Sequence, residues 1–270
     1  MKPYLSPTQL ETLSKCGMQY YWRYIEGLRV PPGIALIKGG AVHASVERDM
    51  RAKAEIGGLL PCDDIADITR DAVHTRWEEF GVHLSDEEAA EGESQVRGQV
   101  IDSAVALATL HHTDVAPSIE PASPKHVERK FRLVFDGFPF DVEGRIDVQD
   151  VDGTIHDAKT ASKTPSADAA HKSVQLTAYA LARKTMDHLD GPLFFDYLVE
   201  TKTKRTHVPI ETTRNTTDFQ AFARRIEAAA KVIETGAYYP CPSDHWVCCD
   251  RWCGYWKDTC PYGRRGRSRV

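Results

Sequence analysis

The stretch FPFDVEGRIDVQDVDGTIHDAKT, residues 138–160, contains two runs of alternating polar and apolar residues separated by the turn sequence VDG. Alternation with a period of two predicts two β-strands, and the Asp-Gly turn predicts that they form a hairpin. Side chains on a strand alternate between its faces, so Asp157 and Lys159 should project from the same side of the second strand. The hairpin should bring Asp147, on the first strand, beside Asp157.

These two carboxylates predict a metal site. Two carboxylates at such a short distance repel each other unless a cation lies between them. Hard oxygen ligands of this kind suit Mg²⁺ or Mn²⁺. Such an ion can activate water and neutralise the charge that develops on a phosphate. Lys159 could orient that water or stabilise the charge at phosphorus. The pattern indicates metal-dependent cleavage of phosphodiesters, although Asp-x-Lys in an exposed hairpin is more often only an ion pair.

The composition of the chain is that of an ordinary globular protein. It has 270 residues, of which 41% are hydrophobic and 27% charged, with a formal net charge of -5. No apolar run approaches the roughly 20 residues of a membrane helix, and the N-terminus lacks the apolar stretch of a signal peptide. We therefore expect a cytoplasmic protein without membrane association, whose cysteines are mostly reduced. The last twenty residues carry six basic side chains and one aspartate, which predicts a basic tail.

The first half of the chain has helical patterns. Ser6-Pro7-Thr8-Gln9 is a capping box that opens a helix carrying Cys16. After a break at Pro31-Pro32-Gly33, a second helix should run from about Lys38 to Ala54, and two more are expected near residues 63–80 and 86–112.

From His126 the period changes to two. A three-stranded meander is expected, made of VERKFRLVF, FPFDVEGRIDVQ and TIHDAKT. A helix at 168–188, the strands LFFDYLVE and KRTHVPIE, and a last helix capped near Thr217 and ending at Gly236 should follow.

Several residues outside the hairpin could complete the site. His43 shares a helix face with Glu47 and could supply a nitrogen ligand. Gln175 and Tyr179, one turn apart on the predicted 168–188 helix, could hydrogen-bond a phosphate or a water. Glu128, at the head of the meander, could reach the metal through a water. The alternative for each is a solvated or packing role.

The cysteines near the C-terminus predict a second centre. Four of them lie in CCDRWCGYWKDTC, residues 248–260, and Cys241 precedes them. In a reducing compartment such a group suggests a metal rather than disulfides. Three spaced thiolates need a fourth ligand for zinc or an iron-sulfur cluster, and Cys16 could supply it. Joining the two ends would restrict a loop of about 230 residues, worth roughly 5 kcal/mol. The alternative is a local zinc knuckle that uses Cys249 or Cys241 and leaves Cys16 as a buried thiol.

Together these motifs resemble the RecB-like nucleases of the PD-(D/E)XK superfamily, in particular the iron-sulfur branch that contains CRISPR-associated exonucleases and the nuclease domain of AddB. Five motifs occur in the order of that family: SPTQLETLSKC, GGAVHASVE, GRIDVQDVDGTIHDAKT, QLTAY and CCDRWCGYWKDTC. The resemblance spans nearly the whole chain. It implies an α+β (α/β) fold with a restriction-endonuclease-like core, in which helices flank a mixed central sheet. One compact unit is expected, with an N-terminal helical region at 1–125, the nuclease core at 126–236, and a cysteine motif and basic tail at 237–270.

The resemblance also implies residue roles. Mg²⁺ or Mn²⁺ would be bound by His43, Asp147, Asp157 and the carbonyl of Ala158. Lys159 would be catalytic, with Gln175 and Tyr179 around the scissile phosphate. A [4Fe-4S] cluster would be held by Cys16, Cys248, Cys253 and Cys260. The spacing here is C-x4-C-x6-C, or C-x3-C-x6-C with Cys249, rather than the more frequent C-x-x-C-x5-C, so either Cys248 or Cys249 could be the ligand.

The implied activity is that of a metal-dependent DNA exonuclease on single-stranded ends, with endonuclease side activity. CRISPR-adaptation or recombination proteins would be its partners, and it could form a homo-oligomer. Aromatic residues interleaved with arginines at both ends of the chain could hold unpaired bases and phosphates. Two alternatives remain: a non-catalytic module that binds DNA ends, and a zinc-stapled scaffold protein.

Overall fold

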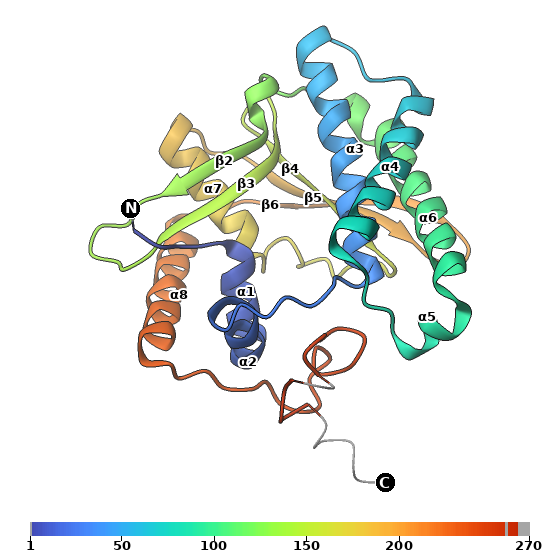
Figure 1. Cartoon of the computed structure of the whole chain (residues 1–270). Helices are drawn as coiled ribbons and strands as arrows, with labels where there is room; N and C mark the ends of the chain where they lie inside the picture. The colour runs from blue at the N-terminus through green and yellow to red at the C-terminus, as the bar shows by residue number, and fades with distance from the viewer. Residues whose placement is uncertain (1, 257–258, 264–270) are drawn as a thin grey trace.

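The computed structural model describes residues 2–256 and 259–263. Lys257 and residues 264–270, which carry most of the predicted basic tail, lie outside the described residues. The described chain forms a mixed sheet with helices on both of its faces (Figure 1), and the predicted fold class is confirmed. None of the described helices combines the length and the apolar character needed to cross a lipid bilayer.

The central sheet has six strands in the order β1-β3-β4-β5-β6, with β2 paired to β3. Their bounds are β1 (Tyr4–Leu5), β2 (Val127–Leu133), β3 (Asp141–Gln149), β4 (Ile155–Ala161), β5 (Leu193–Glu200) and β6 (Arg205–Thr212). The predicted meander is present, because β2, β3 and β4 pair antiparallel in sequence. β4 and β5 are parallel, as the crossover through a helix requires, and β5 and β6 form a hairpin.

One edge of β3 is shared by two neighbours. β1 pairs with Asp141 and Val142 at the beginning of β3, whereas β4 pairs only with Val148 and Gln149 at its end. Among the described strands, none pairs with residues 143–147 along that edge. β3 and β4 therefore diverge immediately beyond their short pairing, next to Asp147 and Asp157.

The helical region differs from the sequence prediction at its breaks. The elements before β2 are α1 (Pro7–Lys15), α2 (Gly17–Tyr20), the π-helical turn η1 (Tyr21–Ile25), α3 (Ile34–Ile56), α4 (Cys62–Phe80), α5 (Asp86–Glu91), α6 (Glu93–Asp114) and the 3-10 turns η2 (Ala116–Ser118) and η3 (Pro124–His126). The capping box at Ser6 is present, but the first helix is interrupted at Cys16, whose backbone is extended. Gly92, at φ 91°, divides the predicted 86–112 helix in two.

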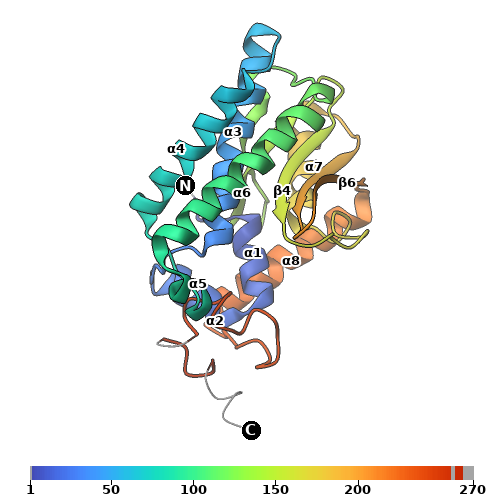
Figure 2. The same ribbon diagram turned by 90° about the vertical axis from the view of Figure 1, so that its right-hand side faces the viewer.

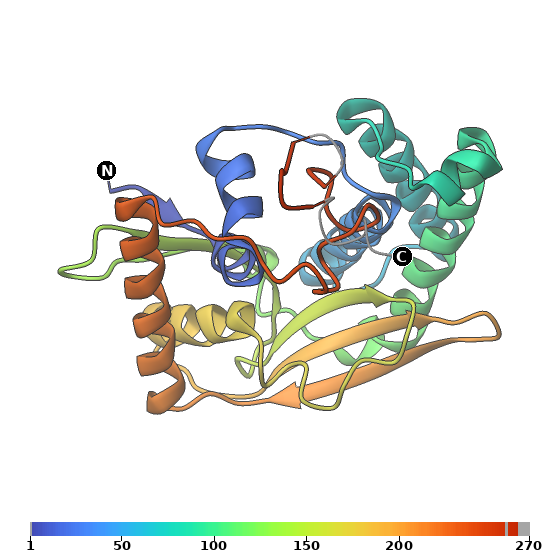
Figure 3. The ribbon, with the colours of Figure 1, turned by 90° about the horizontal axis from the view of Figure 1, so that it is seen from below.

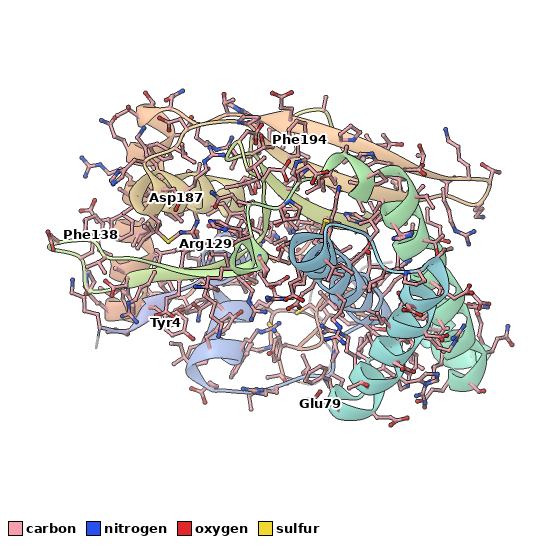
Figure 4. All side chains as sticks on the ribbon, turned by 90° about the horizontal axis from the view of Figure 1, so that it is seen from above. Tyr4, Glu79, Arg129, Phe138, Asp187 and Phe194 are labelled. Carbon is pink, nitrogen blue, oxygen red and sulfur yellow. The ribbon has the colours of Figure 1, made fainter. Side chains whose placement is uncertain are left out.

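Two later helices complete the fold. α7 (Val174–Asp187) begins six residues later than predicted, where the Ser173 side chain caps it. α8 (Thr216–Thr235) is capped by Asn215 rather than Thr217 and ends at Gly236 as predicted. Arg129 on β2 donates to both carboxylate oxygens of Asp187, at 2.6 and 2.8 Å (Figure 4), and so attaches the end of α7 to the meander.

The sheet separates two hydrophobic cores. One core lies on the face covered by α1, α7 and α8, and it includes Ile146, Ile155 and Leu176. The other lies under α3, α4 and α6, and it includes Val148, Ala158 and Leu198. Figure 2 shows the three long helices α3, α4 and α6 together on their side of β4. Because Ile155 and Ala158 belong to different cores, β4 has the alternation that its sequence predicts.

The segment after α8 returns to the N-terminal helices. From the end of α8 it passes α1 and α2 toward the region where α4 meets α5 (Figure 3). The Met18 N–H donates to the Tyr239 carbonyl at 3.3 Å, and the Tyr255 hydroxyl donates to the Leu28 carbonyl at 2.6 Å. These bonds bring Cys16 and the C-terminal cysteines into one neighbourhood.

Candidate functional site

Two buried acids lie where β3 and β4 diverge. Asp157 is fully buried and Asp147 nearly so. Burial, followed by the nearby charge of Asp147, raises the pKa of Asp157 to about 7. Burial also opposes ionisation of Asp147, yet His43 and Lys159 keep the pKa of Asp147 below its ordinary value. At neutral pH one acid of the pair is therefore ionised, and the other is close to its titration point.

Three carboxylate oxygens of this pair are buried with few polar partners. Oδ1 of Asp157 has none among the described residues. Oδ2 of Asp147 lies 3.1 Å from the Nδ1 of His43, and Oδ2 of Asp157 contacts the Lys159 ammonium. Buried polar atoms without hydrogen bonds are rare, because they forfeit their hydration without replacement. A divalent cation would satisfy these oxygens, so the donor set fits the predicted ion.

A third carboxylate approaches from β2. Single ligand atoms of His43, Glu128 and Asp147 lie within 4.8 Å of one another. Glu128 has φ 53°, which a strand residue rarely adopts, and its carboxylate accepts from Arg145 at 3.0 Å. Burial, and then Asp147, raises the pKa of Glu128.

This group of three differs in one member from the ligand set that the resemblance implies. Asp157 lies outside it and contacts Lys159 instead. The backbone of Ala158 hydrogen-bonds to the Asp147 carboxylate, a bond that only its N–H can donate. The sequence predicts that Glu128 could reach the metal through a water, and the register sets it opposite Asp147, because Val127 pairs with Val148 and Arg129 with Ile146.

Lys159 remains a cation although it is largely buried. Burial lowers the pKa of Lys159, but Asp157 and Asp147 more than compensate, and the net shift is upward. Its Nζ lies 5.2 Å from the centre of the Phe195 ring, and its side chain lines a depression shared with Gln175. Lys15, Lys172 and Arg225 line the same depression together with one acid, Glu11, so basic side chains outnumber acidic ones there.

The α7 pair lies on the same side of the sheet. Gln175 Nε2 donates to the Tyr179 hydroxyl at 2.6 Å, and Tyr179 packs edge-on against Phe131. Burial, and then Asp157 and Asp147, raises the pKa of Tyr179 well above its ordinary value, so the phenol stays protonated. The charges of both acids affect the Tyr179 hydroxyl, and in its protonated form this hydroxyl can donate a hydrogen bond to an anionic ligand near them.

The cysteines gather in a separate pocket beyond the C-terminal end of α1. Its lining includes Cys16, Cys241, Cys248, Cys253 and Cys260. Cys249 is absent from that lining, and its thiol donates to the Trp246 carbonyl at 3.4 Å. The Cys241 N–H donates to the sulfur of Cys16, also at 3.4 Å. Burial raises the pKa of Cys241 to about 12 and that of Cys253 to about 11, so these thiols are neutral without a cation.

Comparison with known proteins identifies the superfamily of this chain. A model of the PD-(D/E)XK nuclease superfamily matches residues 4–261, and the chain belongs to that superfamily. The fold is similar to a crystal structure from Eubacterium rectale described as a candidate exonuclease, with 12% identity, a TM-score of 0.56, and coverage of 92% of this chain and 86% of that one. The structure of SSO0001 is matched over 94% of both chains at 12% identity, but its TM-score of 0.35 is too low to support a structural inference. No curated protein matches at a significant level.

Proposed function

We propose that this member of the nuclease superfamily is a metal-dependent DNA exonuclease that cleaves single-stranded ends. One observation carries the proposal: two buried acids, one of which has an oxygen without a polar partner among the described residues, lie between a histidine and a half-buried lysine in a chain of a nuclease superfamily. The depression in front of Lys159 has several basic side chains, which suits a phosphate backbone.

His43, Asp147 and Asp157, together with Glu128 and the Ala158 carbonyl, would hold Mg²⁺ or Mn²⁺. When bound, the ion would supply an activated water and neutralise charge at the phosphate. The Lys159 ammonium would stabilise the additional negative charge on the phosphoryl oxygens, and its raised pKa keeps it protonated for this task. Gln175 and Tyr179 would donate hydrogen bonds that hold the scissile phosphate in place.

Cys16, Cys248, Cys253 and Cys260 would hold a [4Fe-4S] cluster. All four line one pocket. The N–H of Cys241, which donates to the Cys16 sulfur, supports the proposal, because hydrogen bonds to the sulfur ligands tune iron-sulfur clusters.

The cellular setting is proposed from the resemblance alone. We propose a cytoplasmic enzyme that works with CRISPR-adaptation or recombination proteins, and that could assemble into a homo-oligomer.

The decisive experiment uses single strands of one sequence in linear and circular form. With Mn²⁺ or Mg²⁺, the end-labelled linear strand should shorten while the circle, which has no ends, survives. Asp157→Ala should reduce the rate by roughly a thousandfold, because the ion and Lys159 both lose their buried partner. Asp67→Ala, at an exposed position of α4, is the matched control and should cut normally. Unimpaired cutting by Asp157→Ala would refute the site, and rapid cutting of the circle would refute the exonuclease assignment.

Glu128 provides a second prediction. If its carboxylate binds the ion, Glu128→Gln should weaken Mn²⁺ binding by about tenfold, because the amide has the same shape without the charge. Isothermal titration of the metal-free protein measures this directly. Glu143→Gln, also on the sheet but paired with Arg132, should leave the Mn²⁺ affinity unchanged. Equal Mn²⁺ affinities of Glu128→Gln and the parent would show that the Glu128 carboxylate does not bind the ion and only pairs with Arg145.

A further inference from the structure

A groove larger than the depression at Lys159 lies next to the cysteine segment. We name it the arginine groove and define it by Arg23, Arg29, Arg76, Phe80, Arg251 and Trp252, all of which line it. Three segments far apart in sequence form its walls: the chain between α2 and α3, the end of α4, and the C-terminal cysteine segment. The His83 N–H donates to the Pro32 carbonyl at 2.9 Å, and the His83 ring lies 3.1 Å from the Asp250 carbonyl. The walls are therefore tied together rather than merely adjacent.

The positive charge of the groove has no acidic counterpart of similar size. Four arginines line it against one glutamate, Glu79, at the end of α4 (Figure 4). No ion pair between described residues engages any of these four arginines, whereas the arginines on the sheet, such as Arg129 and Arg132, are paired. In a chain of formal net charge -5, this local excess is selective for a polyanion.

Exposed rings accompany these charges. Trp252 is 47% exposed and Phe80 is 48% exposed, so both rings are open to solvent at the groove. The Arg251 guanidinium lies over the Trp252 ring and that of Arg23 over the Tyr24 ring, each 5.5 Å from the ring centre. Flat rings beside unpaired guanidinium groups bind unpaired bases and their phosphates, and a duplex offers no free base faces.

The groove is connected to the acids through α3. Leu36 and Ile37, on the first turn of α3, line the groove, and His43 follows about 9 Å farther along the helix axis. Gly40 lets Arg76 approach α3, since a Cβ at that position would lie 2.5 Å from its Nη1. Arg76 is thus held against the same helix that carries the histidine.

We propose that the arginine groove binds the unpaired nucleotides of a single DNA strand beyond the scissile phosphate, by stacking on Trp252 and Phe80 and by ion pairs with the four arginines. This inference rests on the proposed function for the identity of the polymer, but the groove and its chemistry are independent of the acids. It implies that the cysteine segment, which supplies Arg251 and Trp252, has a direct role in substrate binding besides a structural one.

The test measures binding of a fluorescein-labelled single strand by anisotropy, in EDTA so that no cleavage occurs, over a range of salt concentrations. Trp252→Ala should weaken binding about tenfold with little change in salt dependence, while Trp252→Phe, which keeps a ring, should recover most of the affinity. Arg29→Ala should weaken binding and lower the slope of log K against log salt by about 0.7, as expected for one lost phosphate contact. Arg70→Ala, on α4 outside the groove, is the control and should behave as the parent.

Each outcome decides the proposal. Parent-like affinity and slope for both Trp252→Ala and Arg29→Ala would overturn it, as would equal competition by polyglutamate or by a blunt duplex. Loss of affinity in Trp252→Ala that Trp252→Phe does not recover, with a lowered melting temperature, would also overturn the stacking role. Because EDTA removes cleavage from the assay, a protein that binds through the groove and never cuts would refute the exonuclease function alone. A protein that cuts but binds normally in both variants would refute the groove alone.

Discussion

Among single residues, Asp157 is the one whose protonation state must change when a metal ion binds. The pKa of Asp157 is raised from 3.8 to about 7, chiefly by burial, so the folded protein favours the neutral acid. The stability that comes from this preference is fully present below the unfolded pKa and is lost as the pH rises through about 7. A divalent ion needs the carboxylate, and its binding below pH 7 must therefore release a proton.

This predicts a pH-dependent metal affinity. Mn²⁺ binding should weaken by about tenfold per pH unit below 7 and level off above it. His43 acts in the same direction, because Asp147 raises the pKa of the imidazole although burial opposes this, and a protonated imidazole cannot bind metal. Calorimetric titrations at pH 6 and pH 8 in two buffers would measure both the affinity and the released protons. Asp157→Asn should reduce the proton release, and equal affinity at both pH values would contradict the prediction.

Another residue-scale feature is the backbone of Glu128. Its positive φ is unfavourable for a residue with a Cβ, and such conformations persist only where the surrounding structure enforces them. Here the pairing of Val127 and Arg129 with β3 holds the residues on either side. The result is a carboxylate directed to the neighbourhood of His43 and Asp147.

At the scale of elements, the break between α1 and α2 decides where Cys16 lies. An uninterrupted helix would keep Cys16 on the apolar face with Leu13, but the extended backbone at Cys16 turns it to the C-terminal segment. Gly17 makes this possible because the Tyr239 backbone crosses it. A Cβ at Gly17 would lie 2.7 Å from the Tyr239 oxygen and 2.8 Å from its nitrogen, closer than van der Waals contact.

We predict that Gly17→Ala lowers the free energy of unfolding by about 1–3 kcal/mol, because neither backbone can yield without losing the Met18 hydrogen bond. It should also reduce the metal content of the purified protein. Gly98→Ala in α6 is the matched control, since a Cβ there would meet no atom within 4 Å. This control should gain about 0.5–1 kcal/mol from helix propensity. Chemical denaturation measures both variants, and a neutral Gly17→Ala would show that the crossing segments are not tightly packed.

At the scale of the whole molecule, the cysteine pocket joins the two ends of the chain. A centre held by Cys16 and Cys248 would close a loop of roughly 230 residues and restrict the unfolded chain by about 5 kcal/mol. The acids lie in the middle of that loop, on strands with their own hydrophobic cores. The centre should thus affect folding more than chemistry.

Cys16→Ser is therefore expected to lower the unfolding midpoint and abolish iron and sulfide content, while cleavage per folded molecule changes only a few-fold. Cys62→Ser, at an exposed cysteine on α4, should match the parent in all three measurements. Elemental analysis and sulfide determination separate the alternatives. A colourless protein that contains zinc, and is unchanged by Cys16→Ser, would instead support a local zinc knuckle.

Short-range patterns in the sequence are enough to predict several parts of this protein. The period-two runs around Asp147 and Asp157, the VDG turn and the capping box at Ser6 predict their elements because each pattern acts over a few residues. The ordered motifs identify the superfamily for the same reason. Helix boundaries were predicted less well at Cys16 and Gly92, where one residue departs from the helical backbone to meet a distant segment or to turn the chain.

Which side chains meet in space depends on the folded chain. The divergence of β3 from β4, the position of Glu128 opposite Asp147, and the choice of Cys248 over Cys249 in the pocket lining depend on contacts between segments far apart in sequence. The arginine groove is the clearest case, since its walls come from residues 19–37, 76–83 and 251–255. No local pattern encodes such a surface, because its shape results from hydrogen bonds and packing that exist only after the chain has folded.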